Sequence, residues 1–422
     1  MPPKSALLLQ GPIGPFFRRF ADELLEHGIG VTKINFNSGD SIYFRGPEVV
    51  SYRQPPDEFP AFFRQLVKDR MIDSVFLVGD CREMHKKIIP VAHELGLAVW
   101  VFEEGYLRPD HITLERDGVN GNSKMSKDPS FYREQAAAME PAEEVVPVGN
   151  TFVPFAFQSV VYACATAAGA WRYPHYQHHR DMGLVKQSVA WARSAWRKKS
   201  YAVKERGIFE RAIREWSGNF FLVPLQLHCD FQIVHSDYES IPAFIQEVLE
   251  TFAKHGPSDT RLLVKHHPLD RAYRDYTDLL SELAHSLGIA GRVHYIHDQH
   301  LPTLLKHARG VVTMNSTVGT SALYHHAPVK VMGRAIYNMP ELTYQGSLAN
   351  FFCEIDKVDG ELFDDFNRWM RAHNQINGSF YVEPEGISPE REICERLCAE
   401  GDAEDDDESE SEGPVTLFRP AR

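Results

Sequence analysis

Two short apolar segments, each ending abruptly in polar residues, constrain the fold of this chain more than any other feature. Residues 262–264 (LLV) run into residues 265–268 (KHHP), and residues 311–314 (VVTM) run into residues 315–319 (NSTVG). An apolar run bounded in this way is typical of a buried parallel strand. Open α/β sheets bind ligands at the carboxyl ends of such strands. The sequence therefore predicts a parallel α/β sheet with a ligand site beyond these two strands.

The polar residues beyond the two strands have the chemistry needed to hold a phosphate. A cation, an imidazole and a hydroxyl-rich turn supply donors, and a helix start adds free N–H groups and a positive dipole end. The candidate nucleotide ligands are Lys265, His267, Pro268, Asn315, Ser316, Thr317 and Gly319. As alternatives, His266 and His267 could be core histidines, and Ser316 and Thr317 could only cap their helix.

Length and charge limit the class of protein. The chain has 422 residues, 43% of them hydrophobic and 24% charged, which is enough for two sizeable cores in a globular protein. Of the net charge of −13, eight negative charges come from residues 401–412, so that −5 remains for the rest. This block predicts a disordered acidic tail over residues 399–422, with docking to a basic partner as the alternative. We expect no nucleic-acid partner.

The cysteines and apolar segments indicate a cytoplasmic chain. Six cysteines are scattered without metal-ligand spacing, and we expect them to be reduced. The N-terminal apolar run is too short for a secretory signal, and no segment approaches the roughly 20 apolar residues of a membrane span. Any membrane contact is therefore expected to be peripheral.

Alternating strands and helices predict a first doubly wound domain over residues 1–150. Strands are expected at residues 5–9, 31–36, 74–78 and 98–102, and helices at residues 16–28, 60–68 and 85–95, before an excursion of little periodicity over residues 113–150. Gly11 and Gly14 lie in a turn where a ligand loop belongs, or they only turn the chain. The turn is not a G-x-G-x-x-G fingerprint and has no P-loop lysine, which excludes the usual nicotinamide and ATP sites.

Two adjacent carboxylates follow the expected strand at residues 98–102. Glu103 and Glu104 precede Gly105, and Arg108 lies close behind. Carboxylates at the end of an apolar strand are costly to bury without partners. The pair therefore favours a functional role over the alternative of a solvated loop.

A connecting segment is expected at residues 151–218, with helix continuing to about residue 206. Its first part is apolar, and basic and aromatic residues follow. It is either a buried helix pair between domains or an interfacial surface that meets anionic lipid. The histidines at 175–179 lack acidic or cysteine partners at ligand spacing, so no metal site is predicted there.

A second doubly wound domain is expected at residues 219–350. Strands are expected at residues 221–227, 261–264, 293–296, 311–314 and 329–332, alternating with helices at residues 241–255, 275–287, 301–308 and 316–325. Two such domains facing each other would put their strand ends across one cleft. A helical segment at residues 351–398 is expected to pack back onto the first domain.

Several segments together carry a resemblance to a known family. QGPIGPFFRRFADEL, FEEGYLRPDHITLE, LQLHCDFQIVHSDY, VKHHP and NSTVGTSALYHHAPVKVMG, in this order, closely resemble capsule polysaccharide biosynthesis proteins of Gram-negative bacteria, of the KpsS/LipB type of retaining β-Kdo transferase. The resemblance spans about residues 5–350. It implies a GT-B-like α/β fold of two facing Rossmann-type domains, the first on the acceptor side and the second binding the nucleotide sugar.

The resemblance also implies the reaction and its partners. The donor would be CMP-Kdo, and the first β-Kdo would pass to a lysophosphatidylglycerol acceptor at the cytoplasmic face of the inner membrane, where other capsule biosynthesis and export proteins act. The family's His-Pro pair corresponds to His267-Pro268, and its Ser/Thr-rich helix start to Ser316-Thr317. Its strand-end acidic motif, usually Glu-Asp-Gly, is residues 103–105 here, and its Gln-x-x-x-Asp motif falls on Gln226 and Asp230.

Retaining transfer by two displacements needs a carboxylate nucleophile and a second group that exchanges a proton with the acceptor hydroxyl. We hypothesise that Asp230 is the nucleophile and that Glu103 or Glu104 is the acid/base. Arg108 could pair with the Kdo carboxylate. The alternative for Asp230 is a helix or turn cap.

No cofactor is expected. The single phosphate of CMP could be held by Lys265, His267 and Ser316 without a metal, and there is no Asp-x-Asp motif outside the tail. Two rival functions stay open. One is a transferase of the same fold that uses another nucleotide sugar, such as CMP-sialic acid or a UDP-sugar. The other is a non-catalytic capsule assembly or export factor, against which the intact acids argue.

Overall fold

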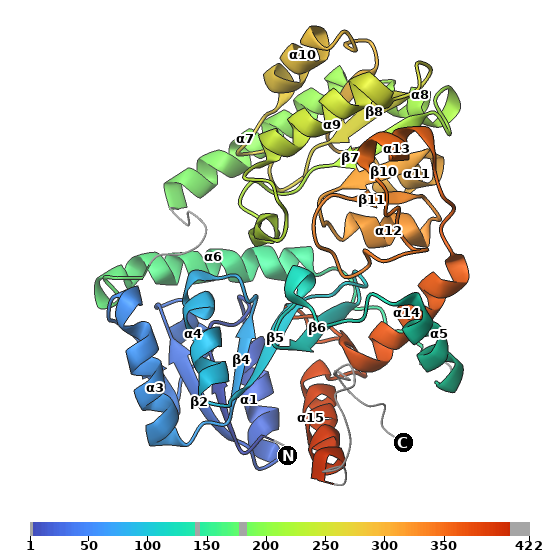
Figure 1. Ribbon diagram of the computed structural model, residues 1–422. Helices are drawn as coiled ribbons and strands as arrows, with labels where there is room; N and C mark the ends of the chain where they lie inside the picture. The colour runs from blue at the N-terminus through green and yellow to red at the C-terminus, as the bar shows by residue number, and fades with distance from the viewer. Residues whose placement is uncertain (1–2, 140–143, 177–183, 406–422) are drawn as a thin grey trace. The chain divides into compact units, whose positions relative to one another are not determined.

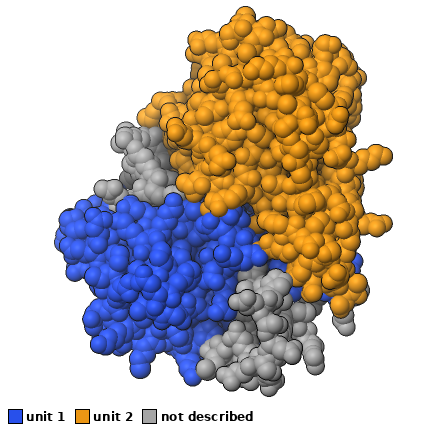
Figure 2. Space-filling view, in the orientation of Figure 1, with its two compact units in different colours: residues 1–124, 139–184, 367–422 blue, residues 125–138, 185–366 orange. Residues whose placement is uncertain are grey.

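A computed structural model describes residues 3–139, 144–176 and 184–405. The chain forms two compact units, drawn in different colours in Figure 2. Unit 1 comprises residues 1–124, 139–184 and 367–422, and unit 2 comprises residues 125–138 and 185–366. This division differs from the expected boundaries at 150 and 218, because the expected connecting segment is shared between the units.

Unit 1 contains a seven-stranded sheet in the order β12-β6-β5-β4-β1-β2-β3. Its strands are β1 (Ser5–Leu8), β2 (Gly30–Asn35), β3 (Val49–Ser51), β4 (Ser74–Val78), β5 (Ala98–Glu104), β6 (His111–Arg116) and β12 (Gln375–Asn377). Its helices are α1 (Phe16–Glu26), α2 (Asp40–Tyr43), η1 (Pro56–Glu58), α3 (Phe59–Arg70), α4 (Glu83–Glu94), η2 (Asn120–Asn122), α6 (Phe152–Ala168), η3 (Ala170–Arg172) and α15 (Pro389–Asp405).

The first five strands of unit 1 are parallel, and β6 is antiparallel to β5 and to β12. One core cluster joins one face of the sheet to α1 and α15, and another joins the opposite face to α3 and α4 (Figure 1). Strand order reverses direction at the junction of β1 and β4. The carboxyl ends of these two strands are therefore where a doubly wound sheet is expected to bind a ligand.

Unit 2 contains a five-stranded, wholly parallel sheet in the order β11-β10-β7-β8-β9. Its strands are β7 (Phe220–Pro224), β8 (Arg261–Lys265), β9 (Val293–Ile296), β10 (Gly310–Thr313) and β11 (Val329–Val331). Its helices are α5 (Pro129–Ala138), α7 (Leu184–Lys204), α8 (Ile208–Arg214), η4 (Phe231–His235), α9 (Ile241–His255), α10 (Thr277–Ser286), α11 (Leu301–His307), α12 (Val318–Tyr324) and α13 (Leu348–Cys353); α14 (Gly360–His373) leads from unit 2 back into unit 1.

The sheet of unit 2 is also covered on both faces. Helices α9, α10 and α13 share a core cluster with β7, β8 and β10 (Figure 1). Strand order reverses at the junction of β7 and β10. Both units are thus doubly wound Rossmann-type domains, and the predicted α/β fold class with two such domains is confirmed.

Three expectations need correction. Residues 113–150 are not an excursion without periodicity, because they hold the end of β6 and the helix α5. The expected helix to about residue 206 is broken after Ala168, and Pro174, which cannot donate a helical hydrogen bond, follows the short η3. The expected tail from residue 399 is wrong in its first part, since α15 extends to Asp405; the remainder lies outside the described residues.

Among the described residues, no helix is both long enough and apolar enough to span a membrane.

Candidate functional site

In unit 2, two buried amide side chains join the strands on either side of the sheet's reversal point. Gln226 follows β7 and Asn315 follows β10, and Gln226 Nε2 donates to Asn315 Oδ1 over 2.8 Å. Asn315 Nδ2 in turn donates to the carbonyl of Gln232 over 2.8 Å. The two predicted ligands are therefore brought together, and they fix the loop that follows β7.

Asp230 begins the short helix η4 in that same loop. Its Oδ1 accepts a hydrogen bond from the backbone N–H of Gln232 over 2.9 Å, so the carboxylate caps η4. Its Oδ2 has no hydrogen-bond partner among the residues that the structure describes. The cap foreseen as an alternative is present, and it leaves one oxygen of a half-buried, well-oriented carboxylate available at the end of β7.

Three residues at the end of β8 lie in different environments. Lys265 is buried, burial lowers its pKa, and its Nζ donates to the carbonyl of His297 over 2.9 Å. His266 is buried with its Nδ1 2.6 Å from the Tyr295 hydroxyl, and burial lowers its pKa to about 3. His267 is half-buried, and Pro268 after it is exposed. The environment of His266 is that of a core histidine, whereas His267 is accessible.

The turn into α12 is held by one buried tyrosine. Tyr337 donates from its hydroxyl to the carbonyl of Ser316 over 2.5 Å. Ser316 Oγ accepts from the Val318 N–H over 3.2 Å, and Thr317 occupies the N-cap position without a side-chain cap bond. A Cβ atom on Gly319 would come within 2.1 Å of the Tyr337 hydroxyl. Glycine at this position is thus required for the tyrosine to reach Ser316.

A carboxylate–imidazole pair at the end of β7 was not foreseen from the sequence. His228 Nδ1 lies 2.5 Å from Asp270 Oδ1, and the His228 backbone N–H donates to Asp270 Oδ2 over 3.1 Å. The Asp270 side chain is fully buried. A separation of 42 residues leaves no local pattern by which the pair could be recognised. The pair ties the loop after β7 to the loop after β8.

A cavity of about 550 Å³ lies in unit 2 beyond the end of β11. It is lined by residues 234–237, which include the end of η4, by residues 330–334 and 347–348, and by Glu247. Ser236 pairs with Gly333 across it, and Arg334 N–H donates to the His235 carbonyl over 2.8 Å. This volume lies within the range of small-molecule sites.

In unit 1, the turn after β1 is held by a cation from the turn after β4. Arg82 Nη1 donates to the carbonyl of Gly11 over 3.3 Å. Gly14 adopts a φ of +119°, and a Cβ there would lie 2.5 Å from Gln158 Oε1 on α6. The predicted tight turn after β1 is therefore present. A role of Gly11 and Gly14 in ligand binding stays a prediction.

The two glutamates at the end of β5 differ in environment. Burial, and then the neighbouring Glu104, raise the pKa of Glu103 to about 7, although its Oε1 accepts the Glu104 N–H over 3.0 Å. Glu104 Oε1 accepts a hydrogen bond from the Tyr381 hydroxyl over 2.7 Å. A carboxyl with a pKa near neutrality is suited to proton transfer. The burial of Glu103 therefore suits it to exchange a proton, while Glu104 is held by the Tyr381 hydroxyl.

Arg108 is exposed beyond the glutamates. Its Nε donates to the carbonyl of Gly105 over 3.1 Å, which fixes the base of the guanidinium in the turn between β5 and β6. Its role toward a sugar carboxylate stays a prediction.

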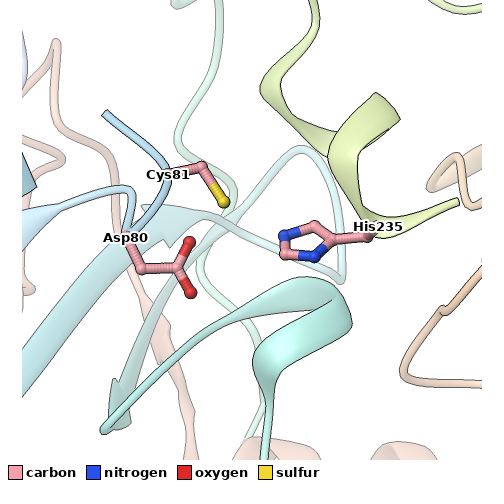
Figure 3. A group of neighbouring side chains, drawn as sticks. All are labelled: Asp80, Cys81 and His235. Atoms are coloured by element: carbon pink, nitrogen blue, oxygen red, sulfur yellow. The ribbon is translucent and has the colours of Figure 1, made fainter. Parts of the chain in front are cut away.

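Figure 3 shows three side chains of types that can bind a metal ion. Asp80 and Cys81 follow β4 in unit 1, and His235 ends η4 in unit 2. Asp80 Oδ2 already accepts from the Val119 N–H and from Asn122 Nδ2. Burial, and then Asp80, raise the pKa of the Cys81 thiol to about 12, which disfavours the thiolate that a metal would bind. We assign no metal to these residues, and metal independence stays an expectation; His178 and His179 lie outside the described residues.

Comparisons with known proteins place the chain in a family. A family model described as "Capsule polysaccharide biosynthesis protein" matches residues 73–381. The chain is 38% identical over 383 residues to the capsule polysaccharide export protein KpsS of Escherichia coli, which covers 90% of this chain and 97% of that protein. It is 39% identical over 387 residues to the capsule polysaccharide modification protein LipB of Neisseria meningitidis, which covers 90% of this chain and 92% of LipB.

Among solved structures, Thermosulfurimonas dismutans KpsC, a beta Kdo 2,7 transferase, aligns with 86% of this chain and 99% of its own at 15% identity, with a TM-score of 0.39. The family model spans most of the chain, and KpsS and LipB are similar to it over nearly their whole lengths. The chain therefore belongs to the family of capsule polysaccharide biosynthesis proteins.

Proposed function

We propose that the protein is a retaining glycosyltransferase that moves β-Kdo from CMP-Kdo to a lysophosphatidylglycerol acceptor and so begins the lipid-linked end of a capsule polysaccharide. The observation that carries the proposal is the orientation of Asp230. Gln226 binds Asn315, Asn315 binds the Gln232 carbonyl, and Asp230 binds the Gln232 N–H. A carboxylate held by such a chain of hydrogen bonds is preorganised to act as a nucleophile.

The chemistry follows from these groups. Asp230 attacks the anomeric carbon of Kdo, the bond from that carbon to the phosphate oxygen breaks, and CMP leaves with the electron pair. Glu103 then takes the proton of the acceptor hydroxyl, whose oxygen displaces Asp230 from the same carbon. Two inversions give net retention. We assign the role of base to Glu103 because its pKa of about 7 allows it to take up a proton near neutral pH.

Donors for the departing phosphate come from the strands beside β7. β8 and β10 are its two neighbours, and they lead into His267 and Ser316. Hydrogen-bond donors at these positions stabilise charge on the leaving phosphate. We do not assign Lys265 a direct bond to the phosphate, because its ammonium group donates to the His297 carbonyl. Its positive charge would still favour the phosphate.

The test is CMP release from CMP-Kdo generated in situ, with and without lysophosphatidylglycerol, with the lipid followed by mass spectrometry. A lipid mass increase of one Kdo that is lost in Asp230→Asn is expected. Asp278→Asn, which changes an exposed carboxylate on α10 of the same unit, is the matched control and should retain turnover.

Two results would count against the proposal. Transfer from CMP-sialic acid or a UDP-sugar, but not from CMP-Kdo, would point to another nucleotide sugar. CMP binding without turnover on any acceptor would instead favour an assembly or export factor, the role in the name of the Escherichia coli relative.

A further inference from the structure

Helix α6 presents three polar side chains to unit 1 and a row of apolar side chains to the outside. Gln158, Tyr162 and Thr166 lie four residues apart on one face. Gln158 Nε2 donates to the Tyr381 carbonyl over 3.1 Å, and the Tyr162 hydroxyl donates to Asp40 Oδ1 over 2.9 Å. Thr166 Oγ1 donates to Asn37 Oδ1 over 3.2 Å. Polar side chains of α6 thus face the protein, whereas those of a usual surface helix face away from it.

The outward face of α6 is apolar along its length. It carries Val153, Phe157, Val160, Cys164 and Ala167, all exposed, and α6 contains no charged residue. Phe152 is 63% exposed, Phe157 is 70% exposed, and Trp171, just beyond the helix in η3, is 80% exposed. Apolar surface of this extent is typical of a contact with a membrane or another protein.

Three exposed arginines lie near this face, two of them by residues that follow the C-terminal end of α6 and one after α2, which packs along the helix. The Arg172 guanidinium lies 5.9 Å from the centre of the Trp171 ring, and that of Arg53 lies 5.7 Å from the Tyr173 ring. Arg45 Nε donates to the Ser41 carbonyl over 2.7 Å, and Ser41 Oγ is 3.1 Å from the Tyr173 hydroxyl. Within the described ranges, none of the three arginines is in an ion pair. An apolar face beside unneutralised cations is complementary to an anionic lipid surface.

We propose that α6 and η3 form the surface by which unit 1 lies on an anionic phospholipid bilayer. The outward side chains of α6 enter the head-group region, Trp171 lies at the interface, and Arg45, Arg53 and Arg172 meet lipid phosphates. The helix lies in the plane of the interface. The apolar segment that could have been a buried helix pair is, for its first half, an interfacial surface.

The surface adjoins a candidate acid/base group. Gln158 of α6 donates to the Tyr381 carbonyl, and the Tyr381 hydroxyl donates to Glu104 beside Glu103. α6 also packs over the turns after β1 and β2, as the contacts of Gln158 with Gly14 and of Tyr162 with Asn37 show (Figure 1). The inference deepens the proposed function and rests on it for the lipid acceptor, which would be taken from the bilayer that α6 contacts.

The first test is flotation of the full chain with phosphatidylcholine vesicles, with and without phosphatidylglycerol, and without any sugar donor. The double variant Val153→Ser/Phe157→Ser is expected to bind about tenfold less, because each buried apolar side chain contributes to partitioning. Leu25→Ser/Met71→Ser changes exposed apolar side chains elsewhere in unit 1 and should float as the parent does. Arg45→Glu/Arg172→Glu should lose the preference for phosphatidylglycerol.

Equal flotation of the parent and Val153→Ser/Phe157→Ser, both folded by thermal melting, would overturn the proposal. So would a parent dimer that the double variant converts to monomer without change in flotation, because α6 would then bind a second copy of the chain. Since no donor is present, failure here is distinct from failure of glycosyl transfer.

The second test reads the position of α6 directly. Cys164 is exposed on the outward face, and a fluorophore sensitive to polarity can be attached to it after Cys229, Cys353 and Cys398 are changed to serine. Its emission should shift to the blue on addition of phosphatidylglycerol vesicles. An unchanged emission from protein that does float would place the lipid contact elsewhere and refute the assignment.

Discussion

The side-chain amide of Gln226 donates to Asn315 Oδ1 over 2.8 Å, and both residues are buried where β7 and β10 meet. Replacing either residue by alanine leaves the other amide buried without this partner. We expect each single variant to lower the free energy of unfolding by about 1–3 kcal/mol. The double variant should lose less than the sum, with a coupling of about 0.5–3 kcal/mol, which urea unfolding of the four proteins would measure.

Gln246→Ala is the matched control for that cycle. Gln246 is exposed on α9 and donates to Glu250 one turn away, so its loss should change stability by no more than about 0.5 kcal/mol. Strictly additive effects of Gln226→Ala and Asn315→Ala would show that the amide pair does not connect the two strand ends in solution.

Gly319→Ala should damage the turn that presents Ser316. The new Cβ would lie 2.1 Å from the Tyr337 hydroxyl, so the ring must move and its hydrogen bond to the Ser316 carbonyl must lengthen or break. We expect a loss of about 1–3 kcal/mol in unfolding free energy, together with weaker CMP binding by calorimetry. Gly291→Ala is the control in the same unit, because no atom of the described residues lies within 4 Å of a Cβ there. Equal stability of the two variants would contradict the prediction.

Most strands and helices of the two sheets could be read from the sequence because their signals are local, but β3 and β6 were not predicted. Buried parallel strands such as β8 and β10 are continuous apolar runs, and the helices between them repeat at the helical period. β12 escaped this reading. It has three residues and exists through antiparallel pairing with β6, more than 250 residues earlier in the chain.

The sequence predicted where the residues of the candidate site lie along the strands, but not which hydrogen bonds they form. Residues 226, 230, 267, 315 and 316 were placed at the strand ends of one domain, and the structure puts them there. The sequence did not reveal that Lys265 turns inward to the His297 carbonyl, since that acceptor belongs to the loop after the neighbouring β9. The bond between His228 and Asp270 was missed for the same reason. Hydrogen bonds between distant loops depend on strand order, which local patterns do not specify.

Removal of the Asp270 side chain should be among the more damaging changes in unit 2. The carboxylate is fully buried and accepts both the imidazole and the backbone N–H of His228. Asp270→Ala leaves both donors without this acceptor, and we expect a loss of about 1–3 kcal/mol by urea unfolding, as for other hydrogen bonds that lose one partner. Asp270→Asn keeps the shape and one acceptor oxygen, so it should lose less. A larger loss in Asp270→Asn than in Asp270→Ala would contradict the account.

Glu103 should make the stability of the protein depend on pH. Its pKa rises from an ordinary 4.5 to about 7 on folding, chiefly through burial. The stability that this shift provides is fully present below about pH 4.5 and is lost as the pH rises through about 7, with a span of about 3 kcal/mol. Glu103→Gln cannot ionise, so its unfolding free energy should exceed that of the parent at about pH 8 and approach it at about pH 5. A constant difference between the two proteins over this range would refute the raised pKa.

The same ionisation should appear in the reaction. If Glu103 takes the proton of the acceptor hydroxyl, only its ionised form is active, and transfer to the lipid should rise with pH through an apparent pKa of about 7. Glu103→Gln should lower the rate by about 10²–10⁴-fold and remove this rise. Glu104→Gln should keep the rise, because it leaves Glu103 able to ionise and changes only the carboxyl that accepts from Tyr381. If the rise with pH survives in Glu103→Gln, Glu103 is not the base and the assignment is refuted.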